Sequence, residues 1–276
     1  MLISKPTPFD EAIRKAEDRQ LLPTTLDSAG IRKLGAAVIE RSVLSARVND
    51  ARILQGIYDA TARLTGVPHE APGDYMGIPE ARLQLKGLLA SIGYTPEPGT
   101  EGTIRDLTTD QRLNLILQTQ TEQAFGFGQY QQQLAVSDAY HGLELLRREG
   151  RKVPRDWFER WDAAGGELYD GRMIALIGDP VWQALGDGEG GYEDTLGNYY
   201  PPFAFNSGMD TYAVDLLECI ELGLITEGEK LPETEADYGE FGQGLEAGVS
   251  NLAGWLTDLV VGSLFGYSVT NGVLSQ

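Results

Sequence analysis

The chain has few of the residue types on which common catalytic and redox sites depend. It holds one cysteine, Cys219, and two histidines, His69 and His141, in 276 residues. A single cysteine cannot form an internal disulfide, which fits a reducing compartment. No Cys/His spacing suits zinc, and neither a G-x-S-x-G elbow nor a G-x-x-x-x-G-K-[ST] loop is present. A catalytic site is therefore not expected, and neither is a metal site or a cofactor.

Basic residues are also scarce. The chain carries 22 Lys and Arg against 41 Asp and Glu, which gives a net charge of −19. This balance opposes direct binding of duplex DNA, because such binding depends on Lys and Arg neutralising phosphates. The charge is uneven: residues 1–64 hold ten basic and eight acidic side chains, whereas the remainder holds twelve and 33. The acidic part either keeps the protein soluble or steers it to a basic partner.

Signals for export and for the membrane are weak. The N-terminus lacks the basic and then apolar pattern of a signal peptide, so no export is expected. Residues 247–276 are apolar and approach the length of a membrane span, but Asp258 lies near the middle of this segment, where a charge is costly. We therefore expect no membrane insertion. We expect this tail to be buried against another subunit, with Trp255 and Phe265 as candidate partner contacts.

The patterning before residue 150 is mostly helical, so we expect a predominantly helical α+β protein. Pro6 and Pro8 favour an extended arm at the N-terminus. Apolar residues at helical spacing, with capping residues and Pro79 at helix starts, predict long helices. The Gly126-Phe127-Gly128 step is expected to bend or end the third of these helices. The predicted helices cover residues 28–64, 79–92, 111–132 and 137–148.

A small α+β unit is expected to follow, built on two compact motifs, residues 155–182 and 199–208. Three of the four tryptophans lie in the first motif, and large aromatic side chains supply much of the burial in a core. The Asp170-Gly171 pair predicts a hairpin between short strands at 167–169 and 173–177. A helix is expected before that hairpin from Asp156 to Ala164, and a short one from Asp179-Pro180. Residues 210–222 are expected to form the last helix.

The order of these motifs resembles that of the phage Mu F-like minor head proteins, also called head morphogenesis proteins. In that family a D/N-G turn, a short strand, a D-P turn and a P-P-x-x-x-N motif precede a helix that ends in a Leu-Gly pair. The matching segments here are DGRMIAL from Asp170, DPVW from Asp179, PPFAFN from Pro201 and the pair Leu222-Gly223. Upstream, residues 106–133 are similar to the family's preceding helix.

The resemblance implies a structural role and a division of the chain. The family often has Cys-Arg-Cys after the Pro-Pro turn and a His before the D-G turn, and this chain has neither, so no metal or catalytic role carries over. The expected regions are an N-terminal arm (1–24), a helical region (25–100), a Mu F-like head protein domain (101–225), and an acidic linker with an apolar Gly-rich tail (226–276). The residues expected to form the structural core of the motif are Trp157, Trp161, Gly171, Asp179, Pro180, Trp182, Pro201, Pro202, Phe203, Asn206 and Gly208.

The function that the resemblance implies is that of a non-enzymatic component of the virion. Its expected partners are the portal protein, the major capsid protein and other copies of itself, with indirect contact to packaged DNA as a further option. It would lie in the head or at the head–tail vertex, after passing through the host cytoplasm. The alternatives are a head–tail adaptor or neck protein and, less favoured, a phage-encoded hydrolase.

The densest basic cluster lies just before and within the first motif. Its arginines could bind carboxylates or phosphates on a partner through their planar forks, or pair with nearby acidic residues such as Glu149, Asp156 and Glu159. The candidate partner contacts in this cluster are Arg147, Arg148, Arg151, Lys152 and Arg155, with Arg160 next to them.

Overall fold

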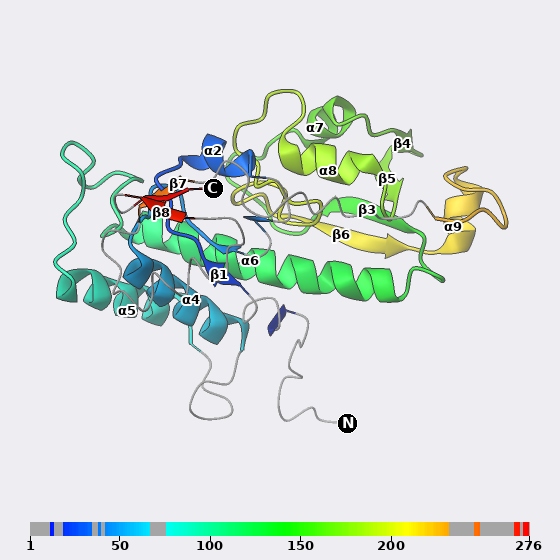
Figure 1. The fold of residues 1–276 in the computed structure, drawn as a ribbon. Coiled ribbons are helices and arrows are strands. Elements are labelled where there is room, and N and C mark those ends of the chain that lie inside the picture. The colour runs from blue at the N-terminus through cyan, green and yellow to red at the C-terminus, as the bar shows by residue number, and fades with distance from the viewer. Residues whose placement is uncertain are drawn as a thin grey trace.

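The computed structural model describes residues 12–13, 19–34, 38–39, 42–66 and 76–231, and also three short strands nearer the C-terminus. These strands, β7 (Glu246–Gly248), β8 (Ser268–Thr270) and β9 (Val273–Ser275), pair in the order β7-β9-β8. The described part of the chain is a mixed α+β fold, as expected (Figure 1). No helix within it has both the length and the apolar composition needed to cross a bilayer.

Three helices form the first core: α4 (Ala51–Thr65), α5 (Ile78–Ser91) and α6 (Asp110–Ala135). The side chain of Asp50 caps α4 and that of Thr109 caps α6, so the first-turn N–H groups find acceptors. Pro79 sits in the first turn of α5, as predicted. Their facing apolar side chains make a single buried cluster, which includes Leu54, Ile57, Leu85, Leu89, Leu113 and Leu117.

The prediction of one helix over residues 28–64 is wrong. The chain forms a short helix α2 (Ser28–Arg32) and a strand β2 (Ser42–Val43), and β2 pairs in parallel with β1 (Gln20–Leu21) before α4 begins. Arg47 has a φ of 61°, a left-handed conformation that ordinary helices exclude. Val43, Leu44 and Val48 are buried without being helical. The apolar residues at three- to five-residue spacing thus belong to separate segments, of which Val43, Val48 and the apolar face of α4 pack in the helical core.

The second part of the fold is an antiparallel sheet with the strand order β4-β5-β3-β6. The bounds of its strands are β3 (Gly142–Arg147), β4 (Leu168–Tyr169), β5 (Arg172–Leu176) and β6 (Met209–Val214). The predicted hairpin is confirmed: Asp170 and Gly171 have φ of 52° and 76°, the two positive values that a tight I′ turn requires.

Two helix predictions around this sheet need correction. Residues 137–148 contain β3, in which Leu143 and Leu145 are buried on one face and Glu144 lies on the other, against Arg172. This two-residue period is that of a strand. Residues 210–222 divide into β6 and a short helix, α9 (Leu216–Glu221), which Asp215 caps.

The long helix α6 connects the two parts (Figure 1). Its first half packs in the helical core, and Tyr130 in its second half belongs to the core beneath the sheet. The helix does not end at Gly126 and Gly128, one of the two outcomes predicted for this step, because it continues to Ala135. A Cβ atom added to Gly126 would lie 1.6 Å from the carbonyl oxygen of Pro201. The glycine therefore permits a close contact with the Pro-Pro turn and does not end the helix.

Candidate functional site

The motifs singled out in the sequence meet in one aromatic core. Trp161 lies in α7 (Trp157–Ala163) and Trp182 in α8 (Pro180–Asp187). Their rings meet edge to face at 5.2 Å, and Trp182 stacks on Phe203 at 5.9 Å. Both indole N–H groups donate to backbone carbonyls, from Trp161 to Glu167 at 2.8 Å and from Trp182 to Leu176 at 2.9 Å. The two motifs therefore form a single packed unit.

The other large side chains of the two motifs lie in different environments. Trp157, Met173 and Phe203 are buried in the same cluster as Trp161 and Trp182. Ile174 is fully buried, but it belongs to a separate cluster with Val214, Cys219 and Ile225 on the opposite face of the sheet. Leu176 and Phe205 are only half-buried.

Local turn chemistry sets the shape of this unit. Asp179 accepts a hydrogen bond from the backbone N–H of Val181, and Pro180 occupies the first turn of α8. The Pro201-Pro202 peptide bond is cis. Asn206 follows with a φ of 51°, and the carbonyl of Gly208 accepts hydrogen bonds from the N–H groups of Arg148 and Glu149 at 2.9 and 3.0 Å.

A polar link that was not predicted ties the Pro-Pro turn to α6. The side chain of Asn198 donates to the carbonyl of Pro202 at 3.1 Å and accepts from Gln123 of α6 at 3.3 Å. Both side chains are buried. Because buried amides normally have all their donors and acceptors paired, these two hydrogen bonds hold the Pro-Pro turn at a fixed position against α6.

Two arginines of the predicted basic cluster are occupied within the protein. Arg155 and Arg160 both form ion pairs with Asp194, with nitrogen–oxygen distances of 2.6 and 2.9 Å. Arg155 also donates to the carbonyl of Phe205, and Arg160 lies over the Tyr192 ring at 4.3 Å. Burial alone would raise the pKa of Asp194, but the hydrogen bond and charge of Arg160, together with the charge of Arg155, lower it overall. The carboxyl that these arginines bind is thus not one of the three nearby acids proposed from the sequence.

Of the other members of the cluster, Arg147, Arg148 and Lys152 are exposed and Arg151 is half-buried. Arg148 pairs with Asp210 at 3.0 Å and Arg151 pairs with Glu149 at the same distance. Arg147 donates to the carbonyl of Arg155, and Lys152 is exposed. Trp255 and Phe265, the partner contacts proposed in the tail, lie outside the described residues.

A groove of about 440 Å³ runs along α6 beside the Pro-Pro turn. On one side lie Glu122, Phe125, Gly126 and Gln129 of α6. The opposite side is made by Pro201, Pro202, the Ser207–Asp210 segment, and Arg148, Glu149 and Arg151 from the end of β3. The structure therefore brings together two residues of the predicted basic cluster, the predicted Pro-Pro turn and a helix face that sequence reasoning did not single out.

Glu122 is the unusual group in this groove. Its side chain is half-buried, and it has neither a hydrogen bond nor an ion pair with any residue that the structure describes. Burial raises the pKa of Glu122 and the charge of Glu149 raises it further, although Arg151 and Arg148 partly oppose this. The two arginines that could neutralise Glu122 are already bound to Glu149 and Asp210. The groove thus offers an acid without a partner among the described residues, beside the exposed ring of Phe125.

Metal-ligand chemistry has no counterpart in the described ranges, where no three His, Cys, Asp or Glu side chains gather in a way that could hold an ion. No protein-family model, curated protein or solved structure matches this chain. The groove and the aromatic core beneath it are therefore the features from which a function can be argued.

Proposed function

We propose that the protein is a structural minor head protein of a bacteriophage, which works by docking on partner subunits of the head. The observation that carries this proposal is the joint packing of the motifs. The D-G hairpin, the D-P helix, the P-P-x-x-x-N turn and the preceding helix α6 form one unit, with Gly126 against Pro201 and Trp182 against Phe203. This supports reading the ordered motif set as a single domain, as the resemblance to Mu F-like proteins implies.

The groove beside the Pro-Pro turn is the docking surface in this proposal. Its occupant is a segment of a portal or capsid subunit that places a Lys or Arg side chain against Glu122. Charge complementarity supports this choice, because residues 65–276 are strongly acidic and Glu122 has no internal counter-ion among the described residues. The exposed ring of Phe125, one helical turn from Glu122, suits the apolar stem of such a side chain.

Replacing Glu122 by glutamine should weaken assembly into heads without lowering the stability of the folded protein. The pKa of Glu122 is raised in the folded state, so folding favours the protonated carboxyl. The protein therefore loses stability as pH rises from the usual glutamate pKa through the raised pKa, where the carboxyl ionises. At pH 7 the Glu122→Gln protein should therefore melt at the same or a higher temperature than wild type. Its incorporation into heads should fall about tenfold or more, because an interfacial charge pair loses one partner.

The control for this experiment is Glu101→Gln, which removes the same charge from an exposed position ahead of α6. Incorporation is measured by quantitative mass spectrometry of purified particles made with each variant. Normal incorporation of the Glu122→Gln protein would show that the groove is not the docking surface. An equal loss with both variants would show that only the overall charge matters.

A further inference from the structure

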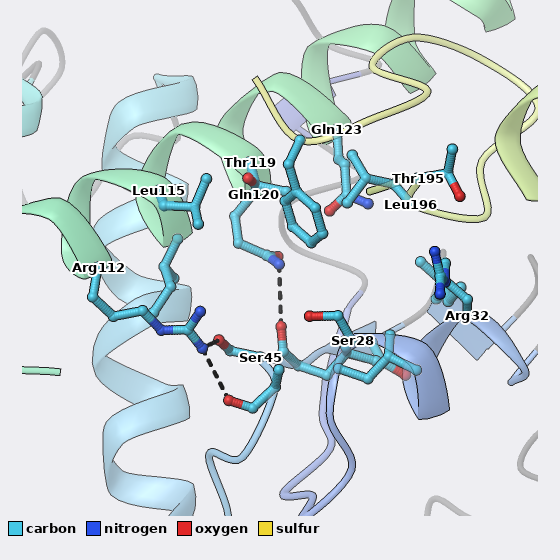
Figure 2. A pocket seen from close by; sticks show the side chains of 17 residues that line it. Ser28, Arg32, Ser45, Arg112, Leu115, Thr119, Gln120, Gln123, Thr195 and Leu196 are labelled. Carbon is cyan, nitrogen blue, oxygen red and sulfur yellow. Dashed lines mark hydrogen bonds between the residues drawn. The ribbon is translucent and has the colours of Figure 1, made fainter. Parts of the chain in front are cut away.

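A second, smaller cavity lies away from the groove (Figure 2). It is lined by residues of α2, by Ile39, by residues of the Ser42–Ala46 stretch, by the first half of α6, and by Thr195, Leu196 and Phe205. Its volume is about 60 Å³, which is room for a few water molecules or one small organic group. Elements from distant parts of the sequence thus enclose a space of defined size.

The lining of this cavity is basic and polar although the chain is acidic. Two guanidinium groups, those of Arg32 and Arg112, face it together with serine, threonine and glutamine side chains, and none of the described residues that line it is an aspartate or glutamate. The chain holds 41 acidic residues. The cavity is therefore a positively charged site in a negatively charged protein.

Arg112 is incompletely satisfied at this site. Its Nη2 group donates to Ser45 Oγ at 3.0 Å and to the carbonyl of Ala46 at 2.9 Å, as Figure 2 shows. Its Nε atom is buried and has no partner. No carboxylate among the described residues pairs with it, and burial lowers its pKa. A guanidinium that is withdrawn from water without a counter-ion is costly, and an anion would offset that cost.

Ser42 provides a second, independent sign of a missing ligand. Its side chain lines the same cavity and is only 2% exposed, yet its hydroxyl group has no hydrogen-bond partner in the part of the chain that the structure describes. Buried hydroxyls are normally paired. Neighbouring polar groups are already used: Gln120 donates to the carbonyl of Leu44 at 3.2 Å and accepts from Arg19 at 2.6 Å. Arg112 Nε and the Ser42 hydroxyl are therefore two buried donors of lining residues that have no partner among the described residues.

We propose that this cavity binds one carboxylate group. One carboxylate oxygen can accept from Arg112 Nε, and the remaining lone pairs can accept from the Ser42 hydroxyl. The apolar side chains of Ile39, Leu44 and Leu115 suit a short carbon chain behind it. The carboxylate is supplied either by a small free acid or by the C-terminus of a peptide, and the size of the space excludes larger anions.

The test measures thermal unfolding of the full chain in sodium acetate. Acetate should raise the melting temperature by roughly 3–5 °C at about ten times its dissociation constant, because it binds only the folded state. Acetamide has the same shape without the charge and should have no effect. Sodium gluconate at the same sodium concentration controls for ionic strength, because it is too large for the cavity. N-acetylglycine, a mimic of a peptide C-terminus, should match acetate only if the mouth of the cavity admits a peptide backbone.

Variants of the residues that line the cavity test whether acetate acts there. Arg112→Gln and the milder Ser42→Ala should abolish or weaken the acetate shift, whereas Arg105→Gln, at an exposed position, should keep it. If Arg112→Gln unfolds, Ser42→Ala decides the matter. A wild-type protein that acetate does not stabilise beyond gluconate would overturn the proposal. So would a rise with sodium chloride but none with acetate, or a full acetate shift in both cavity variants.

Discussion

Replacing Gly126 by alanine should destabilise the protein by about 3 kcal/mol or more, at the upper end of the cost of overpacking. The added methyl carbon would lie 1.6 Å from the carbonyl oxygen of Pro201 and 2.7 Å from its carbonyl carbon. Neither the helix nor the turn can yield easily, since the contact is with backbone and the turn is held to α6 by Asn198 and Gln123. The Pro-Pro turn would have to move away from the helix.

Gly87→Ala is the matched control, because it makes the same change inside another helix. Gly87 lies in α5, and a Cβ atom there meets nothing within 4 Å. Its replacement should stabilise the protein by up to about 1 kcal/mol through helix propensity alone. Chemical denaturation of both variants measures the difference. A loss below about 1 kcal/mol for Gly126→Ala would show that the turn does not press on α6 in solution.

Replacing Trp161 by alanine should cost roughly 3–5 kcal/mol, as truncation of a large buried aromatic ring does. Trp161 is 1% exposed, and its ring meets Trp182 edge to face at 5.2 Å. The change leaves a cavity between α7 and α8, and it also leaves the carbonyl of Glu167 without the indole donor. Both effects act on the core that holds the motifs together.

Phe158, three residues before Trp161 in α7, provides the comparison for this ring. It is in the same helix and is 52% exposed. Phe158→Ala should therefore change the free energy of unfolding by less than about 1 kcal/mol. If the two variants lost similar stability in a urea titration, the aromatic core would not be the main support of this unit.

The elements that the sequence predicted well are those fixed by local chemistry. The Asp170-Gly171 turn requires two positive φ values, and the Asp179-Pro180 pair caps and starts a helix with its own atoms. The helix at Trp157 likewise starts where Asp156 can cap it. These signals lie within four residues of one another, so no tertiary contact is needed to interpret them.

The predictions that failed depended on packing across the chain. The apolar spacing between residues 28 and 64 fitted one helix, but Arg47 reverses the chain and β2 pairs with β1 instead. The helix predicted at β3 is wrong because the alternation of Leu143, Glu144 and Leu145 is short, and its partner strands come from residues 172–176 and 209–214. Sheet pairing over such distances overrides local preference.

The candidate sites could not be predicted from the sequence, because they too depend on contacts between residues far apart in the chain. Glu122 is one of many acids in the sequence, and its isolation follows only from the pairing of Arg148 and Arg151 with other carboxylates. Glycine is a poor helix former, so the sequence alone does not reveal that Gly126 is needed for the close contact with Pro201. The cavity at Arg112 needs three segments more than 60 residues apart, as the hydrogen bond from Arg112 to Ser45 illustrates.

Quantitative mass spectrometry of purified virions tests the proposed function most directly. Particles of a phage that encodes this chain should contain it at fewer copies than the major capsid protein, and the Gly126→Ala variant, with its displaced Pro-Pro turn, should be lost from them. The complete absence of the wild-type protein from particles that hold portal and capsid proteins would contradict a role as a minor head protein.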